Sequence, residues 1–289
     1  MSTTVALIGF GEAAQAFVGD ARWTATASAF DKLTDCPDAR KAKLSQYDTL
    51  RVGGAASASE AVAGAADVIS LVTADQALDA ARSAALQAGT FYFDMNSVAP
   101  ATKREAADVI EGRGGNYVDV AIMAPVLPGR LMAPLLLSGP SADVGANRLR
   151  AIGFGNVKVA GPHIGQAAAV KMIRSVIVKG MEALTAEAAL AANAAGVLDE
   201  VIASLDASEQ SLSWAERIDY NLARMMLHGG RRAEEMAEAA RTLESLGVEP
   251  LVTLGTMKRQ RQIGGRHLAP ADGLAAKLEQ LRPRQANAA

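Results

Sequence analysis

The chain reads VALIGFGEAA from residue 5 to residue 14, and this stretch decides the fold. Val5–Ile8 is a short apolar run typical of a buried strand, and Glu12 opens a stretch of helix-forming residues. Between them Gly9 permits a tight turn, Gly11 lets the main chain come close to a bound group, and Ala14 is small enough for close packing of helix on strand. Together they predict the first strand, turn and helix of an α/β fold.

The same alternation continues through the first half of the chain. The candidate strands are Val5–Ile8, Thr24–Phe30, Val68–Val72, Phe91–Phe93, Tyr117–Val120 and Leu135–Ser138. The candidate helices between several of them are Glu12–Gly19, Ala58–Ala63, Gln76–Gln87 and Thr102–Glu111. Strands that are apolar throughout and separated by helices predict a parallel sheet covered on both faces, which is the doubly wound Rossmann arrangement.

The second half reads as helix alone. Gly165–Ala195 has scarcely a helix breaker and is long enough for one helix of roughly 45 Å. Further candidate helices are Leu198–Leu205, Ser211–Leu227, Arg231–Leu246 and Leu251–Gln262. We therefore expect an α/β protein with a Rossmann domain at residues 1–162 and an all-helical domain for substrate binding and dimerisation at residues 163–289.

Composition narrows the function class. The 289 residues are 50% hydrophobic and 21% charged, with a net charge of −2, so we expect a globular protein and no nucleic-acid partner. Cys36 is the single cysteine, which excludes an intrachain disulfide. The start MSTTVALIGF does not resemble a secretion signal, and the apolar segment Val118–Leu137 contains Asp119, Arg130 and three prolines. We expect a cytoplasmic protein that does not span a membrane.

An acidic residue supports a nucleotide site beside the glycine turn. Asp31 lies twenty residues after Gly11, at the end of the second candidate strand, where a carboxylate accepts hydrogen bonds from the adenosine ribose and repels a 2′-phosphate. Because of Asp31, NAD is the favoured cofactor. NADP is the alternative, because Lys32, followed by Arg40, Lys41 and Lys43, offers cations for a 2′-phosphate. A structural turn can show the same glycines, and Asp31 can be a simple turn residue. The nucleotide-binding residues that we expect here are Gly9, Phe10, Gly11, Glu12, Ala13, Asp31, Lys32 and Thr73.

A later segment carries a family resemblance. Residues 94–100, DMNSVAP, resemble the Asp-x-Ser-Thr/Ser-x-x-Pro segment of the β-hydroxyacid dehydrogenase family, which includes the 3-hydroxyisobutyrate, tartronate semialdehyde and 6-phosphogluconate dehydrogenases. The resemblance spans essentially the whole chain. It implies that Ser97 contacts the cofactor beside the nicotinamide and that Asn96 faces nicotinamide or substrate. From the residues alone, Asn96 and Ser97 can also be a helix cap.

A second segment departs from the family pattern. Residues 118–125, VDVAIMAP, are similar to the family's Asp-Ala-Pro-Val-Ser-Gly-Gly, but apolar residues and a proline replace the Ser-Gly-Gly that presents N–H groups to a substrate carboxylate. By this match Met123 and Ala124 belong to the substrate site. A substrate larger or less polar than the usual hydroxyacids suits them better.

The third segment supplies the candidate catalytic residue. Residues 165–171, GQAAAVK, resemble the family's Gly-x-Gly-x-x-x-Lys, which implies that Lys171 is the general acid and base. Lys171, Arg174 and Ser175 share one face of the long candidate helix. If Lys171 is buried beside Arg174, burial and like charge lower its pKa toward the working range of such a catalyst. The alternative is a lysine whose stem lies along an apolar margin while its head reaches water.

Two neighbours of this lysine are candidate substrate ligands. Ser175 stands where the family has an asparagine that holds the substrate. Arg174 can bind a substrate carboxylate in a bidentate manner, or it can pair with an acidic side chain in the core.

Residues 228–232, HGGRR, resemble a branch of the family whose C-terminal domain is catalogued without a function. The family's Lys-Asp pair near the nicotinamide is not preserved, and Arg231 or Arg232 is the candidate replacement. We expect His163 and His228 to be structural, and no His, Cys and Asp pattern has metal-ligand spacing.

These observations lead to an NAD(P)-dependent oxidoreductase that acts on the CH–OH group of a small hydroxyacid or related alcohol. The resemblance implies a homodimer that buries the long helix. The alternatives are an imine reductase-like enzyme, suggested by the apolar segment at residues 122–125, and a dinucleotide-binding protein without catalysis.

Overall fold

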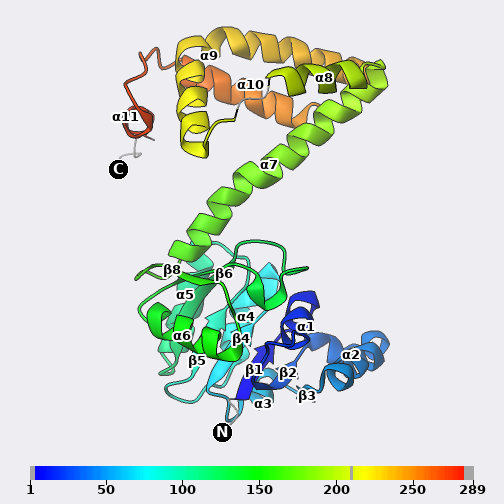
Figure 1. Ribbon diagram of the computed structural model, residues 1–289, viewed down its shortest axis with the longest axis vertical. Helices are drawn as coiled ribbons and strands as arrows, with labels where there is room; N and C mark the ends of the chain where they lie inside the picture. The colour runs from blue at the N-terminus through cyan, green and yellow to red at the C-terminus, as the bar shows by residue number, and fades with distance from the viewer. Residues whose placement is uncertain (1–3, 209–210, 283–289) are drawn as a thin grey trace. The chain divides into compact units, whose positions relative to one another are not determined.

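A computed structural model describes residues 4–208 and 211–282. The chain forms two compact units, Met1–Val176 and Ile177–Ala289. The first is a sheet covered by helices and the second is helical, which confirms the predicted fold class (Figure 1). The boundary predicted after residue 162 lies between the last strand and the long helix that follows it, whereas the compact units divide further along, within that helix.

The described strands form one mixed sheet in the order β3-β2-β1-β4-β5-β6-β7-β8. They are β1 (Thr4–Ile8), β2 (Thr26–Phe30), β3 (Gly53–Gly54), β4 (Asp67–Ser70), β5 (Phe91–Asp94), β6 (Asn116–Ile122), β7 (Leu135–Ser138) and β8 (Val157–Gly161). Neighbouring strands are parallel except β6 and β7, so the prediction of a wholly parallel sheet is wrong there. The connection at residues 123–134 contains only a three-residue 3₁₀ turn and no crossover helix that could return the chain in parallel.

Helices cover both faces of this sheet. The helices of the first unit are α1 (Glu12–Val18), α2 (Pro37–Leu50), α3 (Ala58–Val62), α4 (Ala77–Ser83), α5 (Pro100–Glu111) and α6 (Ala142–Ile152). Val5 and Leu7 of β1 contribute to a core with α1 and α6, whereas Ala6 and Ile8 contribute to a second core with α3, α4 and α5. Alternate residues of one strand thus enter opposite cores, as a doubly wound sheet requires.

The second unit is a set of packed helices entered through α7 (Gln166–Ala195). They are α8 (Leu198–Ser208), α9 (Trp214–Ser245), α10 (Leu251–Gly264) and α11 (Leu274–Gln280). The start of α9 is fixed by a capping box, in which the Ser213 side chain accepts from the Glu216 N–H and the Glu216 side chain accepts from the Ser213 N–H. No helix among the described residues is long and apolar enough to cross a lipid bilayer.

The sequence predicts a break at Gly229-Gly230, but α9 is one helix through both glycines, and that prediction is wrong. A Cβ on Gly229 would lie 2.4 Å from the Gln260 carbonyl oxygen and 2.9 Å from the Cα of Gly264 in α10. The glycine therefore allows two helix backbones to touch. The ribbon of α9 changes direction along its length, and a glycine pair is a known cause of such a bend (Figure 1).

A buried carboxylate joins α7 to α10. Glu187 of α7 accepts hydrogen bonds from the N–H groups of Val252 and Thr253 and from the Thr253 hydroxyl. Burial raises the pKa of Glu187, but the hydrogen bonds outweigh burial and place the pKa below its usual range. The first turn of α10 is thus capped by a side chain from a distant helix.

Candidate functional site

The candidate site lies at the carboxyl ends of β1 and β4. These strands are neighbours at the centre of the sheet, and the chain leaves them toward opposite edges, so a crevice forms between their ends. Two cavities, of about 480 Å³ and about 540 Å³, lie here and share Gly11, Leu71, Val72 and Thr73 on their walls. The expected residue Thr73 is thus placed where the two cavities meet.

The two glycines of the turn have different reasons to be glycine. Gly9 has a φ of +88°, and a Cβ there would lie 2.3 Å from the Leu71 carbonyl oxygen, so the backbone itself requires it. Gly11 has a φ of −80°, and a Cβ there would meet no protein atom within 4 Å. Neither strain nor packing requires glycine at residue 11. Its open side fits a group that passes from one cavity to the other, as the pyrophosphate of a dinucleotide would.

The smaller cavity contains the expected nucleoside residues. Asp31, with 8% exposure, accepts hydrogen bonds from the Phe10 N–H at 2.8 Å and the Leu33 N–H at 3.0 Å. The Lys43 Nζ lies 3.3 Å from the Asp31 carboxylate and donates to the Phe10 carbonyl at 2.8 Å. From the sequence, Lys43 was predicted only as a candidate ligand for a 2′-phosphate. The structure instead pairs it with Asp31, while Lys32 is exposed on the cavity wall.

Phe10 contacts the interior instead of a cavity. Its side chain is fully buried and packs against Tyr47, with the ring centroids 5.0 Å apart. Only its main-chain N–H and carbonyl take part in the network around Asp31. We infer that Phe10 fixes the glycine turn and does not contact the nucleotide with its side chain.

The larger cavity gathers the remaining expected residues. Its polar wall has Glu12, Thr73, Asn96, Ser97 and Lys171, and Ala13 lies beside them. The apolar part of the cavity lining includes Ile122, Ala124, Pro125 and Val126. One space therefore holds polar groups for a reaction and an apolar wall that limits which substrates fit.

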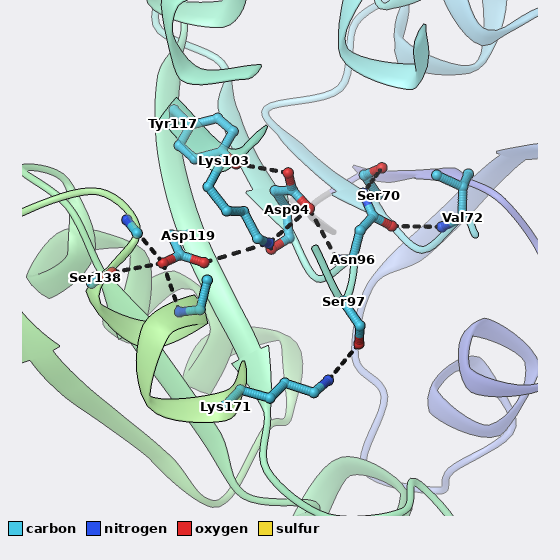
Figure 2. Close-up of polar contacts among 12 residues, drawn as sticks. Ser70, Val72, Asp94, Asn96, Ser97, Lys103, Tyr117, Asp119, Ser138 and Lys171 are labelled. Carbon is cyan, nitrogen blue, oxygen red and sulfur yellow. Dashed lines mark hydrogen bonds and ion pairs between the residues drawn. The ribbon is translucent and has the colours of Figure 1, made fainter. Parts of the chain in front are cut away.

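Lys171 and Ser97 meet at the wall of this cavity. The Lys171 Nζ donates to the Ser97 Oγ at 2.6 Å, although the residues are 74 positions apart in sequence (Figure 2). Lys171 is half-buried in the single chain, which lies between the buried lysine and the lysine with its head in water that the sequence left as alternatives. The geometry nevertheless brings the candidate proton-transfer group to the candidate cofactor-contacting hydroxyl.

Asn96 lies on the same wall, and its amide makes two hydrogen bonds to other residues of the protein. The Oδ1 accepts from the Val72 N–H at 2.7 Å, and the Nδ2 donates to the Ser70 Oγ at 2.9 Å (Figure 2). These bonds join the loop after β5 to the end of β4. Asn96 thus positions the loop that carries Ser97 and also lines the cavity, and its contact with nicotinamide or substrate stays a prediction.

A buried charge network lies directly behind this wall and was not predicted. Lys103 of α5 donates to the Asp94 carbonyl at 2.6 Å and to the Asp94 carboxylate at 2.9 Å, and its Nζ lies 3.4 Å from the Asp119 carboxylate (Figure 2). All three side chains are at most 1% exposed. Tyr117 donates to the second Asp94 oxygen at 2.7 Å. Burial, and then the charge and hydrogen bond of Asp94, raise the pKa of Tyr117.

The two carboxylates of this network fix the two segments that carry Ser97 and Lys171. Asp94 accepts from the Asn96 N–H at 2.9 Å and so fixes the loop that leads to Ser97. Asp119 accepts from the N–H groups of Gly165 and Ala168, both at 3.1 Å, where α7 begins. Lys171 follows one turn later. The sequence did contain a signal for the two carboxylates, because Asp94 and Asp119 stand at aspartates of the family segments. It contained none that paired them with Lys103, which lies on a separate helix.

The other predicted substrate ligands are only partly placed at the cavity. Arg174 is exposed and donates to the Met123 carbonyl at 3.1 Å, so it is not in the core. The residues that line the cavity include Ala124 but not Met123. The Ser175 hydroxyl donates to the Lys171 carbonyl one helical turn earlier, at 2.8 Å.

The basic residues of the HGGRR segment lie in the second unit. Arg231 pairs with Glu235 on α9 at 3.4 Å, and His228 is exposed on the same helix. Their roles stay predictions.

Comparison with known proteins places this arrangement in a family. Residues 192–263 match a family model described as a domain of unknown function, DUF1932. A conserved hypothetical protein from Sinorhizobium meliloti is 36% identical, with 97% of this chain and 96% of that chain covered and a TM-score of 0.61.

Two further solved structures extend the comparison. A conserved protein of unknown function, described as structurally similar to 3-hydroxyacid dehydrogenases, is 28% identical, with 92% of this chain and 100% of that chain covered and a TM-score of 0.57. An imine reductase from Myxococcus stipitatus in complex with NADP⁺ is 20% identical, with 97% and 100% covered and a TM-score of 0.74. A variant of that enzyme was solved with NAD⁺. At 20% identity, the similarity to the imine reductase shows only that the fold is shared. With the full-length relative, the helical-domain match and the likeness to 3-hydroxyacid dehydrogenases, the chain belongs to the β-hydroxyacid dehydrogenase-like family.

Proposed function

We propose that this protein is an NAD(P)-dependent oxidoreductase that acts on the CH–OH group of a small hydroxyacid or related alcohol. The observation that carries the proposal is the 2.6 Å contact between Lys171 and Ser97 on the wall of one cavity, which shares Gly11 with the cavity that Asp31 lines. Structural relatives in complex with NADP⁺ and NAD⁺ support the same cofactor class.

The residues of the chain have distinct tasks in this reaction. When bound, the nicotinamide ring accepts or donates the hydride. Gly11 and Thr73 border the path between the cavities, and Ser97 presents a hydroxyl at the reacting end. The Lys171 Nζ takes the proton of the substrate hydroxyl during oxidation and returns it during reduction. The apolar wall excludes water from the reacting atoms.

The wall also bears on the choice of substrate. Ile122, Ala124 and Pro125 favour a substrate with an apolar portion. Arg174 is exposed beside this segment and is the candidate partner of a substrate carboxylate. We propose a hydroxyacid or alcohol whose chain is more apolar than that of the smallest hydroxyacids.

The test is a turnover screen with a matched pair of variants. NAD⁺ and NADP⁺ reduction is followed by nicotinamide absorbance across hydroxyacids, amino alcohols and aromatic alcohols. For the active substrate, Lys171→Met should lower kcat by about 10²–10⁴-fold, since this is the usual contribution of a positioned general acid or base. Lys158→Met, which changes an exposed lysine of β8 that does not line the cavity, is the control. Near-normal turnover by a folded Lys171→Met enzyme would show that Lys171 has no catalytic role.

The reverse assay, in which oxidation of NADPH or NADH is followed with imines as substrates, addresses the two alternatives. The apolar wall is the observation that favours an imine reductase-like activity, which oxidises NADPH or NADH in the presence of cyclic imines. The candidate acid–base Lys171 favours the alcohol chemistry. Tight nucleotide binding without turnover of any of these substrates would favour a non-catalytic binding protein.

We further propose a homodimer formed through α7. In the single chain this helix exposes large apolar side chains, including Ile173 at 70%, Val176 at 73% and Met181 at 51%. Exposed apolar surface of this kind is typical of a subunit interface. Sedimentation should give a dimer, and Met181→Glu should shift it toward monomer. A wild-type monomer at micromolar concentration would contradict the proposal.

A further inference from the structure

The carboxylate of Asp31 is turned toward the glycine turn. One oxygen accepts from the Phe10 N–H and lies 3.3 Å from the Lys43 Nζ, and the other accepts from the Leu33 N–H at 3.0 Å. The charge that is expected to repel a 2′-phosphate is therefore already paired inside the protein. Sequence reasoning, which favoured NAD because of Asp31, treated this carboxylate as unpaired.

Lys43 is built into the wall as the counter-charge. It lies on α2, is 6% exposed, and bonds both the Asp31 carboxylate and the Phe10 carbonyl. A buried ammonium is costly unless it is paired and hydrogen-bonded, so its placement depends on Asp31. Lys158 of the edge strand β8 is exposed, does not line this cavity and serves as the control.

The other charged side chains on this cavity wall do not restore a repulsive field. Lys32 adds an exposed cation. Asp79 is the remaining acidic residue among those lining the cavity, and it pairs with Arg82 at 3.3 Å. A 2′-phosphate entering here meets paired acids and one exposed cation, and the Coulomb cost of adding this group to the dinucleotide is correspondingly small.

We infer that Lys43 is a specificity-determining residue: by neutralising Asp31 it admits the 2′-phosphate, so that NADP and NAD both bind in this cavity. The inference rests on the proposed dinucleotide function. Lys43 acts on selectivity through Asp31, and it also fixes the glycine turn through Phe10. The second role affects both nucleotides alike, so the ratio of the two affinities isolates the first.

The experiment measures the dissociation constants of NADP⁺ and NAD⁺ by calorimetry for a charge cycle. The wild type should bind the two nucleotides within about tenfold of each other, since a tenfold ratio is only 1.4 kcal/mol. Lys43→Met leaves Asp31 unpaired and should weaken NADP⁺ at least about tenfold more than NAD⁺. Asp31→Asn should shift the ratio toward NADP⁺, and the double variant should return it close to the wild-type value. Lys158→Met, the control, should change neither affinity.

The outcomes separate the inference from the function on which it rests. If the wild type binds neither nucleotide, the dinucleotide function fails and the inference fails with it. If both bind but Lys43→Met weakens them by the same factor, the function stands and Lys43 only supports the turn. If NADP⁺ binds the wild type more than about a hundredfold more weakly than NAD⁺, or if Lys32→Met moves the ratio while Lys43→Met does not, the pairing with Lys43 does not decide selectivity. Should Lys43→Met fail to fold, Asp31→Asn still tests the idea, because an unchanged ratio there overturns it.

Discussion

Replacing Lys103 by methionine should destabilise the first unit severely, because it leaves two carboxylates buried without their cation. The Nζ makes two hydrogen bonds to Asp94 and lies 3.4 Å from an Asp119 oxygen that has no hydrogen-bond partner among the described residues. The methionine side chain is of similar length and fills most of the same space. The change therefore removes charge with little change in packing.

The magnitude follows from burial. Removing one partner of a buried ion pair costs about 3–5 kcal/mol, because the charge left behind remains desolvated. Domains are stable by about 5–15 kcal/mol, so Lys103→Met should remove a large part of the total. For a unit of this size a loss of about 3 kcal/mol corresponds to a fall in Tm of about 6–12 °C.

The assay must report on the first unit alone. Trp23 packs against the core of that unit, whereas Trp214 lies on α9, so denaturation followed by tryptophan fluorescence in a Trp214→Phe background isolates it. Arg104→Met, which removes an exposed cation from the same helix, is the control and should change stability by less than about 0.5 kcal/mol. A Lys103→Met protein within about 1 kcal/mol of wild type would refute the assignment of a buried, charged network.

Three further predictions concern other parts of the chain. Because the pKa of Glu187 lies below its usual range, its contribution to the stability of the second unit should be present above about pH 4.5 and be lost as the pH falls through the folded value; thermal melts of Glu187→Gln should lack that acid loss. Gly229→Ala should destabilise the second unit by circular dichroism, since its Cβ would meet the backbone of α10, whereas Gly230→Ala meets nothing within 4 Å and should be neutral or stabilising by up to about 1 kcal/mol. Arg174→Met should raise KM for an acidic substrate far more than for its ester, and an equal effect on both would return Arg174 to its structural contact with Met123.

Local patterns in the sequence were sufficient for the central fold. Apolar runs and the glycine turn predict the central strands, and the breaker-free stretch predicts α7 almost to the residue. Two of the elements that the sequence did not predict, α2 and β8, lack such patterns. The α2 sequence is largely polar, and the residues it buries include a lysine and a tyrosine, so apolar periodicity does not reveal it. The edge strand β8 has a single buried residue, Val157.

The site shows a sharper division. Family spacing selected Ser97 and Lys171, and the structure brings them together. Family spacing could not show that the Asn96 amide is hydrogen-bonded to Ser70 and Val72, or that Lys43 pairs with Asp31. Such pairings depend on groups that meet only after the sheet has formed. A polar residue in a motif predicts a place in the fold more readily than it predicts which partner the residue will choose.

The carboxylate of Asp119 has a consequence for the order in which the protein matures. The residues lining the nucleoside cavity all lie between residues 8 and 83, whereas Asp119 reaches its partners only when Ser138 of β7 and Gly165 and Ala168 at the start of α7 are in place. Contacts that close long loops form late, and a chain emerging from the ribosome folds from its N-terminal end. We expect the contacts of Asp119, and with them the position of Lys171, to form only after these later segments have emerged, so that reactivity is the last property the first unit gains.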